Sequence, residues 1–586
     1  MYPLSWMCYN KLNNKNGGYE MKFKDFEYQR PNLEQLKAQY GSLIQSLREA
    51  DSASVGLDVI KQIQSLQRDI DTQYTLVSIR HSIDTRDEFY EKENEFWDEN
   101  LPYISEYNTE YYKAILDSPY LEDFKKELPE TFFKMMENDL KVFSPEIIPL
   151  LQQENKLSSE YSKLLASAEI EFQGETYNLT GLSKFFESPD RAVRQEVNQL
   201  SWNFFQENLE QLDRIYDELV KLRHKMAVQL DFKDYVEMGY ARMNRLDYTR
   251  EDVEVYRKEV LKHVVPLVEY IYERQSKRLG IDTMKNYDLG LSFLSGNPTP
   301  KGDSEEIIAN AKRMYSEMSP ETKEYFDFML EHDVMDLETK PGKQGGAYCT
   351  YIPNYKAPFL FANFNGTSND VDVLTHEAGH GFQVFESRWI ETPEVVWPTF
   401  ETCEIHSMSM EFMAWPWLEL FFKEQTTKQK YAHLAGTAIF LPYGVLVDHF
   451  QHEVYEHPEM TPEERRLKWR ELEKLYNPWK DYDGNEVLEG GAFWMRQHHI
   501  YNSPFYYIDY TLAQVCALQF WQRGQIIQDD TFWEDYLAIC KVGGTKSFTQ
   551  VVELANLKVP FQEGSLESVS HAIRDYLEQI PESELE

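Results

Sequence analysis

The sequence predicts a mainly α-helical protein with a small β-sheet. Apolar residues recur at three- and four-residue spacing through most of the N-terminal half, and this is the period of an amphipathic helix. One short aromatic segment near residue 360, bounded by prolines and a glycine, has the composition of a strand instead. No apolar run approaches the roughly 18 residues that a membrane-spanning helix needs, so we expect no membrane partner.

Helical periodicity predicts a series of elements along the chain. It covers residues 32–50, 55–82, 87–97, 103–117, 188–230, 251–279 and 426–457. The pattern breaks at residues 168–179, where apolar and aromatic residues flank Gly174, and this is typical of a β-hairpin. The glycine- and proline-rich residues 296–302 predict a loop.

Residues 376–380, His-Glu-Ala-Gly-His, carry the pattern that most directly predicts chemistry. Four residues are just over one helical turn, so His376 and His380 leave the same face and can bind one metal ion. A zinc ion that hydrolyses a substrate needs three protein ligands and an open position for water. Glu377 lies where its carboxylate can hold that water. The motif therefore predicts two zinc ligands and a general base, and it requires a third ligand from elsewhere.

Two neighbouring helices are predicted around this motif. Residues 371–389 form the first, with Asn369 or Asp370 as its N-cap, and residues 398–422 form the second. A short helical hairpin of this kind brings a carboxylate beside the HExxH helix, as in gluzincin sites.

The second helix offers candidates for the third ligand. Glu404 and Glu411 are two turns apart on one stripe, and Ser407 falls between them. The surrounding residues are apolar, so the helix is predicted to be buried, and a buried carboxylate needs a partner. We expect one carboxylate to bind the metal, the hydroxyl to donate a hydrogen bond, and the other carboxylate to orient a ligand. For any single acidic residue in this chain, a solvated surface position is the alternative.

The aromatic segment at residues 355–365 is predicted as a strand directly before the zinc helix. Such a strand can offer unpaired backbone groups to an extended peptide, which binds by strand addition. A core strand is the alternative, and the two interpretations are compatible.

These residues together resemble the thimet oligopeptidase and oligoendopeptidase F family of zinc metallopeptidases, with the bacterial oligoendopeptidase F and Pz-peptidase branch most similar. The resemblance extends from about Tyr111 onward. Its blocks are His376–His380, Glu404–Ser407 with Glu411, Gly345–Cys349, Pro358–Thr367, Gln497–Tyr501 and Pro504–Tyr510. Many relatives have a bulky residue where Ala378 stands, which is a conservative difference on the face away from the metal.

The resemblance implies a fold and a substrate class. It implies two helical lobes that enclose a deep channel, which would admit short peptides and exclude folded proteins. It also implies that a histidine and one or two tyrosines near the C-terminus stabilise the oxyanion, because phenol and imidazole groups can donate hydrogen bonds to it. We assign these roles to His499, Tyr507 and Tyr510, and the adjacent His498 is the alternative histidine.

The predicted reaction is hydrolysis of internal bonds in short peptides with one Zn²⁺ per chain. His376, His380 and Glu404 are the predicted ligands, and Glu377 is the base that activates the water. One alternative is a zinc exopeptidase of the carboxypeptidase type, which would need a fixed positive charge for the terminal carboxylate, and Arg496 is a candidate for it. Another is a non-catalytic helical scaffold with a structural zinc, which would need a fourth protein ligand.

Charge and cysteine content narrow the partners and the compartment. The net charge of −39, from 99 acidic and 60 basic residues, argues against a nucleic-acid partner. Five cysteines, odd in number and widely spaced, indicate reduced thiols and a cytoplasmic location. The oligomeric state, the preferred side chains and the physiological substrate are left open.

We divide the sequence into three regions. Residues 1–20 are predicted as a disordered lead that is not translated natively, with Met21 as the natural start. Residues 21–200 form an N-terminal helical region that contains the hairpin, and residues 201–586 form the zinc metallopeptidase catalytic region.

Overall fold

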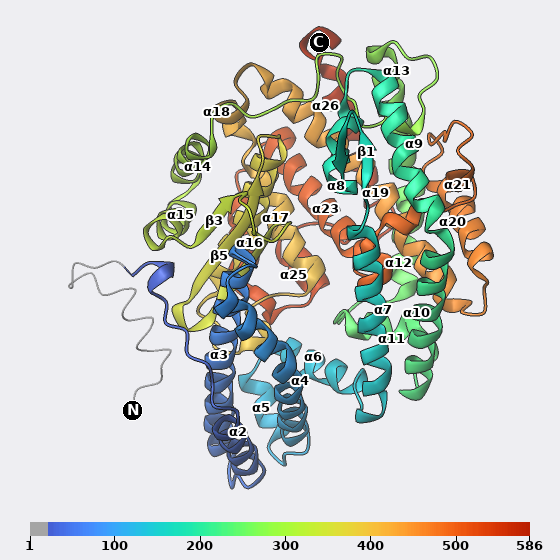
Figure 1. Ribbon diagram of the computed structural model, residues 1–586. Coiled ribbons are helices and arrows are strands. Elements are labelled where there is room, and N and C mark those ends of the chain that lie inside the picture. Colours follow the sequence, from blue (N-terminus) through green and yellow to red (C-terminus); the bar gives the residue numbers. More distant parts are fainter. Residues whose placement is uncertain (1–20) are drawn as a thin grey trace. The chain divides into compact units, whose positions relative to one another are not determined.

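The computed structural model describes residues 21–586, so the predicted lead lies outside the described residues. Helices dominate, and the strands form one two-stranded and one three-stranded sheet (Figure 1). This confirms the predicted fold class of a mainly α protein with a small sheet. No helix of the described residues is both long and apolar enough to cross a membrane.

The chain forms two compact units, each assembled from three stretches of sequence. Unit 1 takes in the chain up to residue 140 together with residues 299–423 and 529–556, and unit 2 takes in residues 141–298, 424–528 and 557–586. The sequential regions predicted above are a different kind of division, and they stay a prediction. The predicted channel also stays a prediction.

The main elements of unit 1 are α2 (Leu33–Arg48), α3 (Ala53–Ile83), α4 (Glu88–Leu116), α5 (Leu121–Glu127), α6 (Glu130–Lys141), α14 (Ser304–Met318), α15 (Pro320–His332), β3 (Met335–Glu338), β4 (Tyr348–Ile352), β5 (Ala357–Phe364), α16 (Asn369–Ser387), α17 (Phe400–Met413), α18 (Leu418–Phe422), α24 (Phe532–Val542) and α25 (Phe548–Leu554). The long helix α4 replaces the two helices predicted for residues 87–117. The core of this unit joins α2–α6 to the end of α16.

The main elements of unit 2 are α7 (Ile148–Ala166), β1 (Ile170–Phe172), β2 (Glu175–Tyr177), α8 (Leu179–Leu182), α9 (Arg191–Glu207), α10 (Leu209–Gln229), α11 (Tyr235–Arg242), α12 (Arg250–Glu259), α13 (Val265–Leu279), α19 (Thr426–Glu456), α20 (Pro462–Tyr476), α21 (Glu486–Glu489), α22 (His498–Asn502), α23 (Tyr507–Trp521) and α26 (Glu567–Gln579). Strands β1 and β2 form the predicted hairpin. The single helix predicted for residues 188–230 is instead α9 and α10, which meet at Asn208.

The three-stranded sheet has the order β3-β5-β4. Strand β5 pairs in parallel with β3 and antiparallel with β4, so both of its edges are occupied. Its residues are almost all buried, and α16 packs against it. The prediction that this strand offers unpaired backbone groups to an extended peptide is therefore wrong. Its interpretation as a core strand is right. The two edge strands beside it are β3 and β4.

The two predicted site helices are present, with different ends. Helix α16 begins after Ser368, which makes no side-chain cap, so the predicted cap at Asn369 or Asp370 is wrong. The carboxylate of Asp370 accepts hydrogen bonds from the backbone N–H groups of Asn365 and Gly366 instead, at 2.9 and 2.7 Å. Helix α17 ends at Met413 rather than near residue 422, because Pro416 follows in a 3₁₀ turn and cannot continue the α-helical ladder.

Candidate metal and catalytic site

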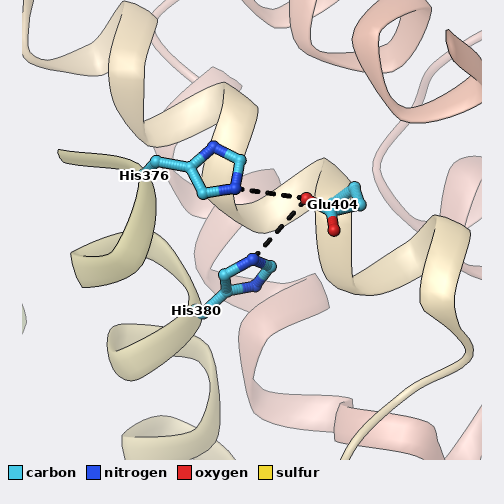
Figure 2. A group of neighbouring side chains, drawn as sticks. All are labelled: His376, His380 and Glu404. Carbon is cyan, nitrogen blue, oxygen red and sulfur yellow. Dashed lines mark ion pairs between the residues drawn. The ribbon is translucent and has the colours of Figure 1, made fainter. Parts of the chain in front are cut away.

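The three predicted metal ligands meet in unit 1. His376 and His380 leave one face of α16, and Glu404 faces them from α17 (Figure 2). The Oε2 atom of Glu404 lies 3.3 Å from Nε2 of His376 and 3.5 Å from Nε2 of His380. The three potential ligand atoms are within 4.8 Å of one another. Two imidazole nitrogens and a carboxylate oxygen are a donor set that suits zinc.

Glu411 determines which nitrogen of His376 faces Glu404. Its Oε1 atom lies 2.7 Å from Nδ1 of His376, and because a carboxylate can only accept, Nδ1 carries the proton. In the neutral ring, which is the form that binds a metal, Nε2 then presents a lone pair toward the Glu404 carboxylate. Two acceptor atoms 3.3 Å apart favour a cation at this position. The structure thus brings the predicted orienting carboxylate to the predicted ligand.

The charges of the cluster are strongly coupled. Burial on its own would lower the pKa of His376, but Glu404 and Glu411 raise it well above the usual range. Burial would raise the pKa of Glu404, but His380 and His376 lower it. The hydroxyl of Ser407 also donates to Oε2 of Glu404 at 3.0 Å. Glu404 is therefore held as a carboxylate in a buried position, which is the form that binds a metal.

Gly379 lets the two site helices approach each other. A Cβ atom at this position would lie 2.7 Å from the carbonyl oxygen of His406 and 2.7 Å from Cα of Ser407. Real Cβ atoms do not make such contacts, so only glycine allows this packing. No role was predicted for Gly379, although a glycine inside a helix is a signal of close packing.

Glu377 lies on the same helix with a different environment. Glu377 is 8% exposed, and its Oε2 atom is buried without a hydrogen-bond partner among the described residues. Burial raises the pKa of Glu377, and the charges of His376 and His380 lower it in part. A buried carboxylate without a donor at one oxygen is a good acceptor for a proton from a small molecule such as water.

The predicted oxyanion groups gather in unit 2. His499 lies on α22, and Tyr507 and Tyr510 lie one turn apart at the start of α23. The ring centre of His499 is 4.9 Å from that of Tyr507 and 5.8 Å from that of Tyr510. His498 is exposed and contacts Tyr161 instead, at 5.3 Å between ring centres. Of the two candidate histidines, His499 is the one beside the tyrosines.

Gln497 orients His499, and the sequence analysis did not assign it this role. Its side-chain amide lies 2.8 Å from Nδ1 of His499, while its Oε1 accepts from the Tyr443 hydroxyl at 2.8 Å. Because Oε1 of Gln497 accepts from Tyr443, the amide nitrogen of Gln497 is the group that faces His499, and its N–H donates to Nδ1. Burial lowers the pKa of His499 to about 4, with a smaller effect from His498. The ring is therefore neutral at pH 7, and its proton is on Nε2.

Comparisons with known proteins agree on one family. The family described as "Peptidase M3 N-terminal domain" matches residues 23–143, and "Peptidase family M3" matches residues 310–571. The second match contains both groups of site residues, since it extends from before α16 to beyond α23.

Individual relatives point the same way. Group B oligopeptidase PepB of Streptococcus agalactiae is 26% identical over 367 residues, which are 56% of this chain and only 57% of the relative's length. An oligoendopeptidase F homologue of Borreliella burgdorferi is 22% identical over 82% of this chain and 81% of its own. The solved structure of Pz peptidase A with an inhibitor is 51% identical, has a TM-score of 0.89, and is matched over 96% of this chain and 100% of its own.

Proposed function

The chain belongs to peptidase family M3, and we propose that it is a zinc-dependent endopeptidase that hydrolyses internal bonds of short peptides. One observation carries this proposal. Nitrogen atoms of His376 and His380 and a carboxylate oxygen of Glu404 converge around one point, next to a buried carboxylate that no described residue binds at Oε2. A structural zinc would call for a fourth ligand, and among the described residues the cluster has three.

Zinc fits this donor set. His376, His380 and Glu404 would hold the ion, and Glu411 would orient His376 by accepting a hydrogen bond from its Nδ1–H group. When bound there, Zn²⁺ supplies Lewis acidity that polarises a peptide carbonyl and lowers the pKa of water.

The remaining steps belong to the side chains. Glu377 accepts a proton from the attacking water as the oxygen–carbon bond forms. It then gives that proton to the nitrogen of the leaving amine as the peptide bond breaks. Its raised pKa suits both steps, because the group has to bind the proton and release it again.

His499, Tyr507 and Tyr510 are proposed to stabilise the oxyanion. The Nε2–H group of His499 is available because Gln497 occupies Nδ1. Burial raises the pKa of Tyr507 to about 12, so its hydroxyl remains a donor at neutral pH. Donors that are fixed before the reaction stabilise developing charge without reorganisation.

The substrates that we propose are short peptides in extended form. Strand β4 is one of the two outer strands of the sheet and packs against α16, and an extended peptide could bind along it by strand addition. We also propose a cytoplasmic location, since the four cysteines of the described residues are unpaired. Cell fractionation would test the location.

A quenched-fluorescence peptide with both termini blocked tests the proposed function. We expect cleavage at internal bonds, complete loss of activity with a zinc chelator, and recovery on adding Zn²⁺. Mass spectrometry of the products identifies the bonds that are cut. Cleavage only of peptides with a free C-terminus would support a carboxypeptidase, and absence of any chelator-sensitive cleavage would support a scaffold.

The oxyanion role makes a separate prediction for Tyr510→Phe and His499→Ala. Each should lower kcat by about a hundredfold or more with little change in KM, because the hydrogen bond forms mainly in the transition state. Gln497→Leu should share part of this effect, since the tautomer of His499 is then no longer fixed. Steady-state kinetics and melting temperatures should be measured together. Normal turnover with a lower melting temperature would mean that these residues serve only packing.

A further inference from the structure

A cavity of about 810 Å³ in unit 2 has an unusual lining for this chain. Lys480, Arg496 and His498 line it, and none of the described residues that line it is acidic. Acidic residues outnumber basic ones by 99 to 60 in the whole sequence. A cavity with basic and no acidic lining in such a chain is suited to an anion.

Lys480 forms a buried part of the wall. Its side chain is 8% exposed, and Nζ lies 3.3 Å from Oε1 of Glu473 and 3.3 Å from the centre of the Phe493 ring. Burial lowers the pKa of Lys480 to about 8, so the amine is mainly charged at pH 7. Glu473 also pairs with Arg470, at 3.2 Å. Arg470 in turn pairs with Glu489, at 2.9 Å, so these two cations and two carboxylates balance, and Lys480 lies in the wall as a member of an ion-paired group.

Arg496 supplies a second cation in a more accessible position. Arg496 is exposed and lines the cavity, and its guanidinium carbon lies 5.2 Å from the centre of the Phe493 ring. The structure records no ion pair between Arg496 and any described residue. A guanidinium group that stands over an aromatic ring and has no acidic partner is well placed to bind a carboxylate through two parallel hydrogen bonds.

Another part of the lining is apolar. Trp202 and Phe205 come from α9, and the Trp202 ring stacks near Phe493 with 5.5 Å between ring centres. Leu289 adds a further apolar surface. The cavity thus combines a surface for a hydrophobic side chain with a cationic end, which matches a peptide that ends in an apolar residue with a free carboxylate.

Two residues of the cavity lining lie close to the His499 group. Arg496 directly precedes Gln497, which orients His499. The amine of Lys480 lies 5.4 Å from the ring of Tyr443, which holds Gln497 and lies 5.8 Å from the Tyr507 ring. The charge of Arg496 also lowers the pKa of Tyr507, against the larger effect of burial. A group bound in the cavity would therefore lie near the proposed oxyanion donors.

We propose that this cavity is a substrate subsite in which Arg496 binds a carboxylate of the peptide, while Trp202 and Phe205 contact the adjoining apolar side chain. The inference rests on the proposed function for its ligand, a short peptide. Two sources can supply this chemistry: the free α-carboxylate of the C-terminus, or an aspartate or glutamate side chain.

Calorimetric titration tests the subsite without relying on turnover. The full-length chain carrying Glu377→Gln would be titrated with acetylated pentapeptides that end in leucine, either as the free acid or as the amide. We expect the acid to bind about tenfold more tightly, which is the value of one partly solvated charged hydrogen-bonded pair. Adding Arg496→Gln should remove the preference. Arg574→Gln is the matched control, because this exposed arginine of α26 lies outside the cavity lining and pairs with its own helix neighbour Glu578.

The outcomes distinguish the two sources of the carboxylate, and they distinguish the subsite from the proposed endopeptidase function. An amidated peptide that ends in glutamate should bind like the free acid if the site accepts any carboxylate, and like the amide if it accepts only the C-terminus. Equal affinity for acid and amide, or a preference that survives Arg496→Gln, would overturn the subsite. Chelator-sensitive internal cleavage of the amide by the unmodified chain would uphold the endopeptidase in either case. Cleavage of the acid alone would reject the endopeptidase and leave the subsite standing.

Discussion

Glu377→Gln should lower kcat by about 10²- to 10⁴-fold, which is the contribution of general-base catalysis. Glutamine keeps the shape of the side chain but cannot accept the proton from water or return it to the leaving amine. Glu377 is not one of the three residues of the His–His–Glu cluster, so the zinc content should stay near one per chain. Steady-state kinetics together with elemental analysis of the purified variant measure both quantities.

Glu386→Gln is the matched control, since Glu386 lies on the same helix and outside the cluster. It undergoes the same chemical change, and burial also raises its pKa. We expect its kcat to stay close to that of the unmodified chain. If Glu377→Gln kept substantial turnover with full zinc, another group would have to be the base.

The fold class could be predicted because most of its evidence is local. Period-3.6 patterns depend on residues within one helix, so the helices α2, α3, α16 and α19 correspond to predicted segments. The ends were less accurate where one residue decides them, as at Ser368 and Pro416. The assembly of each unit from three separate stretches depends on long-range packing, which no local pattern contains.

The sheet shows the same limit. The sequence predicted β5 from its composition but not its place between β3 and β4. Strands of four and five residues, such as β3 and β4, have too few positions to show a period. Whether a strand is central or at an edge depends on its neighbours in the sheet. These neighbours place β5 in the centre and leave β3 and β4 as the strands that have an outer edge.

The candidate site was predictable where spacing and chemistry coincide. The motif predicts His376 and His380, the buried acidic helix offers Glu404 and Glu411 as the third ligand, and the structure brings Glu404 to the two histidines. The tautomer of His499 could not be predicted, because it depends on Tyr443, which is 54 residues from Gln497 in the sequence. The cavity around Arg496 likewise joins residues from distant segments.

Glu404→Ala should abolish zinc binding and activity together. Glu404 is 5% exposed and is the only carboxylate of the described residues in the His–His–Glu cluster. Alanine leaves two histidines, which do not complete a three-ligand site. Loss of a carboxylate that only orients a ligand costs about 10- to 100-fold in metal affinity, so Glu411→Gln should show a loss of that size and Glu404→Ala a clearly larger one. Competition with a fluorescent zinc chelator measures both.

Thermal unfolding gives an independent measure of the same prediction. A ligand that binds only the folded state stabilises it in proportion to the logarithm of its concentration over Kd. Added Zn²⁺ should therefore raise the Tm of the metal-free unmodified chain and of Glu411→Gln, but leave the Tm of Glu404→Ala unchanged. Zinc affinity that survives Glu404→Ala would show that Glu404 is not the third ligand. Glu401, which is buried on the same helix, and Glu411 would then be tested by the same substitution.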